Sequence, residues 1–205
     1  MSDRRVDESK RATLRRFAAI GTAGSLTRFA GAGEAEADSD SDARDAIEGY
    51  LQATPGAHFS KIRDDLQLGT GETQHHLREL VEAGTVESYP DGDYRRFVPA
   101  GRFEAFERTA LSYLRRDTAR RMILTLLSKP DATGGEIADA AGVSRPTVSK
   151  YAAKLEEAGL LDRTEGYSLV RPETILVLVV RYAESFDEET VAFARDADSL
   201  VAYDP

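Results

Sequence analysis

The sequence predicts a mainly α-helical protein with small β-hairpins, an α+β class in which one unit occurs twice. Three observations support this. Apolar residues recur at helical spacing through much of the chain, runs of alternating polarity flank glycine-containing turns, and the second half repeats the pattern of the first. With 205 residues, the chain is long enough for two small domains that each bury a core.

The repeat is ungapped, with an offset of 75 residues. Ile47 aligns with Met122 near the start of the repeat, and Gly84 aligns with Gly159 near its end. Few aligned positions are identical, but nearly all keep their apolar or turn character. A duplicated fold must retain these properties, because core faces and turn chemistry specify the structure.

The second copy predicts three helices followed by a hairpin. Gly142 marks a tight turn before the third helix, because glycine adopts the left-handed conformation without strain. Ser144 is expected to cap that helix, with Pro146 in the first turn, where a missing N–H costs nothing. Two short strands around Glu165-Gly166 complete the unit. The expected apolar helix faces comprise Met122, Ile123, Leu126, Leu127, Val148, Ala152 and Leu155.

The first copy follows the same order. Its hairpin is expected to run from residue 86 to residue 98 around Asp91-Gly92, a dipeptide typical of type I′ turns. Its predicted core residues are Ile47, Tyr50, Leu51, Ile62, Leu66, Leu68, Leu77 and Leu80.

A short helix, a tight turn, a second helix and a two-stranded hairpin together make a winged helix-turn-helix unit. Residues 54–99 resemble a group of archaeal transcriptional regulators with two tandem winged-helix domains. Residues 144–151 resemble the recognition helix of many prokaryotic winged-helix repressors. The resemblance covers about residues 43–186. It implies a tandem winged helix-turn-helix fold and a transcription regulator of haloarchaeal type.

The domain organisation follows from the repeat. We expect the two winged helix-turn-helix domains at residues 43–101 and 118–172, joined by a connecting helix at residues 102–117. Residues 173–205 are expected to form a helical segment. Residues 1–42 combine a basic arm with an acidic linker, expected to be poorly ordered because its alternating acids cannot bury apolar surface.

The basic arm contains Arg15-Arg16 ahead of an apolar stretch, which resembles a twin-arginine export signal. Phe17 follows the arginine pair directly, Arg28 interrupts the apolar run, and several glycines make the segment a poor helix. We therefore favour a cytoplasmic protein with a weakly helical basic arm over export or membrane anchoring.

The composition excludes several classes of site. The absence of cysteine excludes disulfides, cysteine nucleophiles and thiolate zinc sites, and three histidines leave little room for a metal site. The chain also lacks a phosphate-binding glycine loop and a nucleophile elbow, so we expect neither an enzyme nor a cofactor. No residue identifies a small-molecule effector.

The formal net charge of −9 argues at first against a nucleic-acid partner. However, only 5 of the 27 basic residues are lysine and half of the 36 acids are aspartate, a composition that resembles proteins of extreme halophiles. The alternative is an ordinary acidic mesophilic protein. At molar salt the Debye length is about 3 Å, so a halophilic DNA-binding protein needs a few close contacts more than a basic surface.

The third helix of the second copy has no acid between Ser144 and Leu155. The exposed N-terminal side chains of such a helix reach base edges in the major groove, where arginine and lysine contact guanine or phosphate. A solvated helix face is the alternative interpretation. The predicted DNA contacts here are Ser144, Arg145, Thr147, Ser149, Lys150 and Lys154.

The corresponding helix of the first copy is expected to bind DNA more weakly. Glu72 would be repelled by phosphate unless it contacts a cytosine, whereas Gln74 can pair with adenine. His75 and His76 are adjacent, so their side chains point about 100° apart on a helix. We therefore predict no metal site there and expect His76 to pack at the edge of the core. The predicted DNA contacts are Thr70, Gln74, His75 and Arg78.

Arginines flank both hairpins and are predicted to contact the DNA backbone or minor groove. Arg95 and Arg96 follow the first turn, and Arg163 lies on the second wing. The alternative for each is an ion pair with a nearby acid on the protein surface.

Two further helical segments are expected. One lies between the copies and is dense in arginine; the other, residues 173–186, contains an apolar run at 175–180 that is too short to span a bilayer. A helix that is apolar on nearly all sides must be buried in a core or against a partner, so we predict a homodimer interface. The residues from Asp187 onward are expected to form a solvated acidic helix or tail.

These patterns together predict a sequence-specific regulator that binds double-stranded DNA, most simply as a homodimer. The alternative is a tandem winged-helix interaction module, of the kind found in subunits of chromosome-condensing complexes. That alternative suits the acidity and the apolar run, but it leaves the acid-free helix unexplained.

Overall fold

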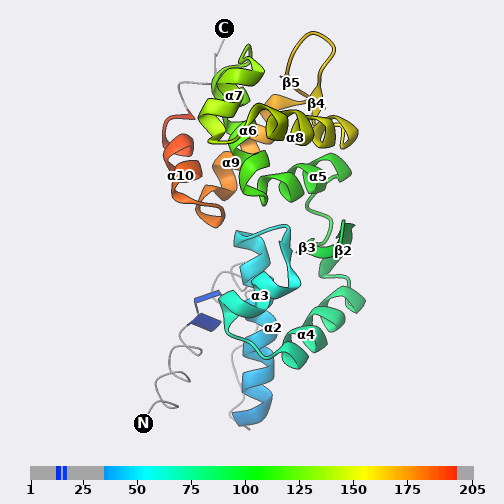
Figure 1. The fold of residues 1–205 in the computed structure, drawn as a ribbon. Helices are drawn as coiled ribbons and strands as arrows, with labels where there is room; N and C mark the ends of the chain where they lie inside the picture. Colours follow the sequence, from blue (N-terminus) through cyan, green and yellow to red (C-terminus); the bar gives the residue numbers. More distant parts are fainter. Residues whose placement is uncertain (1–12, 15, 18–34, 198–205) are drawn as a thin grey trace, which may run out of the picture. The chain divides into compact units, whose positions relative to one another are not determined.

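The structure, a computed structural model, describes residues 13–14, 16–17 and 35–197 and confirms the mainly helical α+β class (Figure 1). The chain divides into unit 1, residues 1–103, and unit 2, residues 104–205. Within the described residues, no helix combines the length and the apolar character needed to cross a bilayer.

From residue 35 onward, unit 1 consists of helices and a three-stranded sheet. Its elements are α2 (Ala35–Ala53), β1 (Ala57–His58), α3 (Phe59–Leu66), α4 (Thr70–Glu82), β2 (Val86–Asp91) and β3 (Tyr94–Pro99). The sheet is antiparallel in the order β1-β3-β2, with both Ala57 and Ser88 paired to Phe97. Strand β1 was not predicted, because two residues carry no recognisable alternation.

The acidic segment expected to be a linker is instead the first part of helix α2, which begins at Ala35. Alanine has the highest helix propensity, and acids near a helix N-terminus interact favourably with the helix dipole. The same alternation of alanine and acids that cannot form a core can therefore form a helix continuous with the buried residues of α2.

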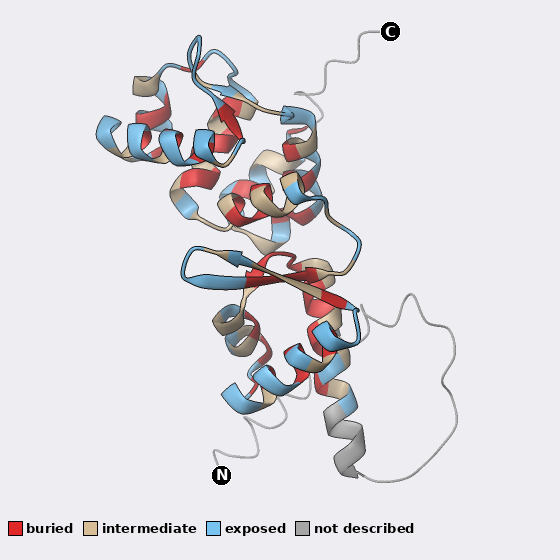
Figure 2. Ribbon diagram, turned by 90° about the vertical axis from the view of Figure 1, so that its right-hand side faces the viewer, coloured by how far each residue is buried: buried red, intermediate tan, exposed pale blue. Residues whose placement is uncertain are grey.

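The predicted core of unit 1 is confirmed. Buried residues of α2, α3 and α4 (Figure 2, red) form one apolar cluster with residues of the sheet, and Ile47, Leu51 and Ile62 have no exposed surface. Two residues of the arm join this core: Leu14 is buried, and the ring of Phe17 lies 5.3 Å from that of Tyr50. Residues 1–12, 15 and 18–34, which include Arg15 and the apolar stretch of the export-like segment, lie outside the described residues.

The turn between α3 and α4 forces Gln67 into the left-handed conformation, with φ 55°, at the position that Gly142 occupies in unit 2 with φ 67°. Replacing Gln67 with glycine is expected to stabilise unit 1 by about 0.5 kcal/mol. The reason is that relief of a left-handed strain of about 1–2 kcal/mol exceeds the extra entropy that glycine loses on folding. Urea denaturation checks this, and Gly142→Gln is the reciprocal control, expected to destabilise unit 2.

The first hairpin has a different turn from the one predicted. Asp91 pairs with Tyr94, so the two central turn residues are Gly92 and Asp93, not Asp91 and Gly92. Gly92 has φ 61°, whereas Asp93 does not have a positive φ. A positive φ at the first central residue alone is the pattern of a type II′ turn, which also matches the twist of paired strands.

Unit 2 repeats this order of elements, with an additional helix before the repeat and further helical elements after it. Its elements are α5 (Ala105–Leu114), α6 (Asp117–Ser128), α7 (Gly134–Ala141), α8 (Arg145–Glu157), β4 (Leu161–Asp162), β5 (Ser168–Leu169), α9 (Pro172–Tyr182), the 3₁₀ turn η2 (Ala183–Ser185) and α10 (Glu188–Arg195). Helices α3 and α7 both have 8 residues, and α4 and α8 both have 13, at the offset the sequence repeat predicts.

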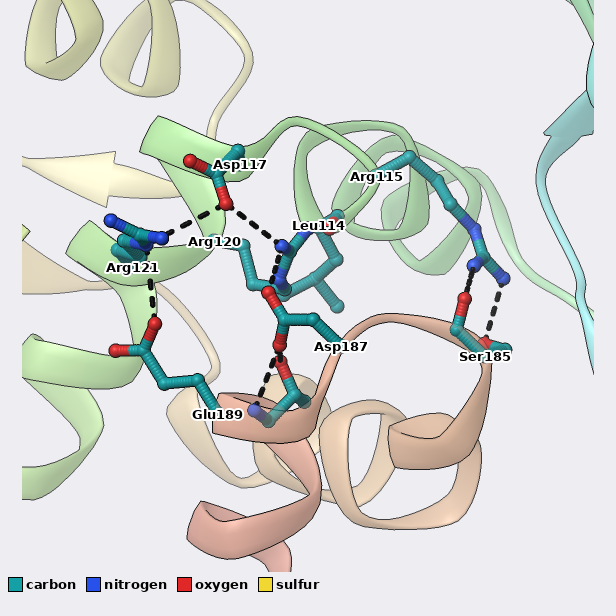
Figure 3. Close-up of polar contacts among 9 residues, drawn as sticks. Leu114, Arg115, Asp117, Arg120, Arg121, Ser185, Asp187 and Glu189 are labelled. Atoms are coloured by element: carbon teal, nitrogen blue, oxygen red, sulfur yellow. Dashed lines mark hydrogen bonds and ion pairs between the residues drawn. The ribbon is translucent and has the colours of Figure 1, made fainter.

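Helix α5 was expected to connect the two copies, but it packs against α6 and α9 of its own unit. The arginines that follow it hold the C-terminal elements in place (Figure 3). Arg115 donates to the Ser185 carbonyl at 2.6 Å, and Arg120 donates to the Leu114 carbonyl at 2.9 Å and to the Asp187 carboxylate. The arginine density of this region is therefore structural.

Of the two forms expected after Asp187, a helix is present, α10, with Glu188 and Glu189 exposed, but it is tied to the rest of unit 2; residues 198–205 lie outside the described residues. Asp187 caps α10, accepting from the Thr190 N–H at 2.8 Å, and the Thr190 side chain is fully buried. Burial alone would raise the pKa of Asp187. Hydrogen bonds from the Thr190 side chain and backbone and from Arg120, together with the Arg120 charge, outweigh burial and lower this pKa below its ordinary value.

Because its pKa is lowered in the folded state, the Asp187 carboxylate stabilises unit 2 above the ordinary aspartate pKa of about 4, and this contribution is lost as the pH falls through the lowered value. The melting temperature of Asp187→Asn is expected to lie below that of the wild type at pH 7. The difference should narrow at pH 3, and a difference that is constant with pH would contradict this assignment.

Helix α9 is only partly buried. Ile175, Leu178 and Val179 pack inside unit 2, as expected for an apolar helix. Val177 and Val180 are 61% and 42% exposed, three residues apart on the outer face. The fold of unit 2 thus leaves part of the apolar surface of α9 uncovered.

Candidate nucleic-acid interface

Helix α8 of unit 2 begins with local interactions that the sequence predicted. Gly142 ends α7 in the left-handed conformation, and the Ser144 hydroxyl accepts from the Thr147 N–H at 3.4 Å. Pro146 occupies the first turn, and Val148, Ala152 and Leu155 form the buried face. Because one face is fixed in the core, the opposite face of α8 is presented to solvent.

The outward face of α8 carries most of the predicted contact residues. Arg145, Ser149, Lys150 and Lys154 are exposed, whereas Thr147 is half-buried. The Ser144 and Thr147 hydroxyls lie 2.9 Å apart and hydrogen-bond each other. The hydroxyls of Ser144 and Thr147 are therefore occupied by the helix cap. The hydrogen-bond donors that remain on this face are those of Arg145, Ser149, Lys150 and Lys154.

Helix α4 occupies the matching place in unit 1 but has a different surface. Thr70, Gln74, His75 and Arg78 are exposed, as predicted. Glu72 is not available for a base, because its carboxylate accepts from the Gly69 N–H at 3.0 Å and so closes the N-terminal turn. The repulsion of phosphate anticipated for Glu72 is reduced by this use of its charge at a helix N-terminus.

Comparisons with known families agree with this geometry. Residues 41–111 match a family model described as an N-terminal HTH domain, and residues 117–163 match the model of the bacterial regulatory protein ArsR family. The chain is a regulator with two tandem helix-turn-helix domains. A search of curated proteins and a search of solved structures found no match. The two matched domains indicate a DNA-binding regulator rather than an enzyme.

The third helices of the two helix-turn-helix units, α8 and α4, differ in how their basic side chains are paired. Within the part of the chain that the structure describes, Arg145, Lys150 and Lys154 of α8 form no ion pair with a carboxylate. On α4, by contrast, His75 Nε2 lies 3.4 Å from Glu79 Oε1, and Arg78 Nε lies 3.9 Å from Glu82 Oε1. The acid-free window of the sequence therefore corresponds to a set of unneutralised cations on one helix face.

The first wing contains two adjacent arginines with opposite environments. Arg95 is exposed and donates to Ser88 Oγ at 2.9 Å, which leaves it at the surface as predicted. Arg96 is only 4% exposed, with its Nε 2.5 Å from Asp91 Oδ2 and its Nη1 2.8 Å from the Gly56 carbonyl. The prediction that Arg96 contacts DNA is wrong, because successive strand residues point to opposite faces of the sheet.

The second wing places Arg163 in an exposed position near the carboxylate of Glu156, with 3.4 Å between Nη1 and Oε2. Its guanidinium also lies 6.0 Å from the centre of the Tyr167 ring. An exposed ion pair at this distance is weak, so Arg163 can exchange Glu156 for another anion at little cost.

The two histidines of α4 lie closer together than the sequence suggested. His76 is buried, which confirms its expected place at the core edge, and its ring centre is 5.3 Å from that of His75. His75, His76 and Glu79 each offer one atom of a type that can ligate a metal ion, and these three atoms lie within 4.8 Å of one another. All three side chains come from a single helix, and the contacts of the Glu79 carboxylate with both rings account for the grouping.

Two glycines at the start of α7 support the interface and were not singled out from the sequence. A Cβ on Gly135 would lie 2.9 Å from Arg145 Nη2, and one on Gly134 would lie 3.2 Å from the Tyr167 hydroxyl. The absence of side chains thus lets the first residue of α8 and the wing both pack over α7. The adjacent Gly134-Gly135 pair was the signal that the sequence offered.

The start of α7 is itself rigidly fixed. Glu136 accepts from the Thr133 N–H at 2.8 Å and pairs with Lys129 at 2.5 Å. The hydrogen bond from Lys129, with those from Thr133, lowers the pKa of Glu136 to about 2. Glu136 therefore stays ionised at any working pH, and the surface on which Arg145 rests is kept in place.

Proposed function

We propose that this protein is a sequence-specific DNA-binding transcription regulator that contacts the major groove chiefly with α8. The observation that supports this most is the exposed set of Arg145, Lys150 and Lys154, which have no carboxylate partner among the described residues of a chain with net charge −9. Unpaired cations are costly to place together, because they repel one another. A negatively charged partner provides the missing counter-charge.

The roles on α8 follow from position along the helix. Arg145, at the N-terminus, can donate two parallel hydrogen bonds to a guanine edge, and Lys150 can reach a base or a phosphate one turn later. Ser149 can bond either. Lys154 lies about one turn beyond Lys150, further from the entering end, which suits a phosphate contact. Ser144 and Thr147 are proposed to contribute to DNA binding mainly by capping α8, and each has only its hydroxyl to offer to the DNA.

Unit 1 is proposed to contribute weaker contacts. Gln74 can pair with adenine, while Thr70, His75 and Arg78 can reach the backbone once the nearby acids release them. On the wings, Arg95 and Arg163 are proposed to hold phosphates or enter a minor groove.

A homodimer is proposed to form through α9, with a second copy of the chain covering Val177 and Val180. A two-fold axis would place both α8 helices on a palindromic site. Mass measurement in solution at micromolar concentration checks this. The wild type is expected to be a dimer and Val177→Asp plus Val180→Asp a monomer, whereas a monomeric wild type in high salt would contradict it.

Chromatin immunoprecipitation with sequencing tests the function directly. The wild type is expected to give discrete peaks with a shared sequence element, and these peaks should vanish in Arg145→Ala plus Lys150→Ala at equal protein level. If the wild type gives no peaks and instead co-purifies with a chromosome-condensing complex, the protein is an interaction module and the proposed function fails.

A further inference from the structure

Unit 1 has a groove between α4 and its wing whose apolar floor the DNA-binding proposal does not use. Its cavity volume is about 330 Å³, and its apolar lining includes Phe59, Leu77, Val81 and Phe97. Volumes of about 300–1,000 Å³ with a mainly apolar lining are typical of small-molecule sites. A DNA-facing surface gains nothing from such a groove, because phosphates and base edges are polar.

Polar groups gather at the rim of this groove. Gln74, Arg78 and Arg95 line it, together with one acid, Glu82. The Arg78–Glu82 pair is long, 3.9 Å, and both side chains are more than half exposed, so it holds Arg78 only weakly. Arg95 is bonded to a neutral hydroxyl and has no carboxylate partner among the described residues. Two guanidinium groups are therefore available beside an apolar floor.

We propose that this groove binds a hydrophobic carboxylate. The apolar part of such a molecule would lie against Leu77, Val81 and Phe97, and its carboxylate would accept charge-assisted hydrogen bonds from Arg78 and Arg95. Of the polar groups at the rim, the two arginines outnumber the one acid, so an anionic head is favoured over a cationic one.

The proposal extends to regulation, and this part rests on the proposed function. The rim residues Gln74, Arg78 and Arg95 are also the side chains through which unit 1 is proposed to contact DNA. A bound carboxylate neutralises the two arginines and occupies the space beside α4. Its binding therefore weakens DNA binding, and the effect acts through unit 1 while α8 is unchanged.

Calorimetric titration of the full chain with octanoate tests the site itself. We expect saturable binding, with one octanoate per chain. Octanol, which has the same apolar chain without the charge, should bind at least about tenfold more weakly. Val81→Asp should abolish binding, since it places a charge on the groove wall. Ala192→Asp, which adds the same charge on exposed α10, should bind octanoate like the wild type.

Three outcomes overturn the site: no saturable binding of octanoate, equal binding of octanol, or unchanged binding by Val81→Asp. A second measurement, DNA affinity with and without saturating octanoate, tests the regulation. The wild type should lose affinity and Val81→Asp should not respond, whereas an unchanged wild type overturns the regulatory part. If the chain binds no DNA at all, the proposed function fails, while the calorimetric result still decides the site.

Discussion

Replacing Arg145 and Lys150 together with alanine is expected to weaken specific DNA binding about a hundredfold, because each close cation contact to a base or phosphate contributes about 1–3 kcal/mol. The stability of unit 2 should be unchanged, since both side chains are exposed and neither forms an ion pair with a carboxylate of the described residues. Fluorescence anisotropy with a labelled operator and a parallel urea denaturation measure the two quantities.

The matched control removes the same two charges elsewhere in unit 2. Arg181→Ala plus Arg195→Ala changes two exposed residues away from α8 and should keep nearly full affinity. If the control loses as much affinity as the α8 variant, DNA binding depends on net charge rather than on the α8 face, and the assignment of the interface is wrong.

Salt dependence gives a second readout of the same contacts. Each phosphate contact that is lost lowers the slope of log affinity against log salt by about 1, so the double variant should have a slope smaller by up to about 2. A wild type that uses few close contacts should keep specific binding at high salt. Loss of specific binding far below molar salt would contradict the halophile interpretation of the composition.

Replacing Arg96 with alanine is expected to destabilise unit 1 by about 3 kcal/mol. The change removes the Arg96 ion pair of the nearly buried Asp91 carboxylate and the hydrogen bond that Arg96 donates to the buried Gly56 carbonyl. DNA affinity measured on the folded fraction should stay the same. Urea denaturation measures the loss of stability, and a change below about 1 kcal/mol would show that the Arg96 interactions are exchanged for water at no cost.

The neighbouring residue provides the control for Arg96. Arg95→Ala removes an identical side chain one position earlier, but this arginine is exposed and bonded only to Ser88. It should leave stability nearly unchanged and lower DNA affinity modestly. The two arginines thus separate the structural and binding roles of one strand.

Features that depend on nearby residues were predicted well. The Ser144 cap, the left-handed Gly142, the buried faces of α6 and α8 and the repeat itself depend on residues a few positions apart, or on a pattern that both copies share. The prediction of helix-turn-helix domains needed nothing more. The type of the Gly92 turn was wrong because the strand register, which the dipeptide alone does not specify, sets the two central residues.

The features that were wrong depend on distant partners. Helix α5 belongs to unit 2 because it packs on α6 and α9, and the C-terminal acids are held because Asp187 meets Arg120, 67 residues away. The acidic segment at the start of α2 is helical because the rest of that helix is anchored in the core. None of these partners is close in sequence, so composition alone suggested linkers and tails.

By itself, the sequence determined that this protein has two winged helix-turn-helix units and that the third helix of the second unit has no acid between Ser144 and Leu155. Only the tertiary structure decided which cations are available to a partner. Arg96 is neutralised by Asp91 and bonded to a carbonyl 40 residues away, whereas Arg145, Lys150 and Lys154 have no carboxylate partner among the described residues. The physical reason is that the charge of a side chain is a local property, while its neutralisation depends on which acids the fold brings within a few ångströms.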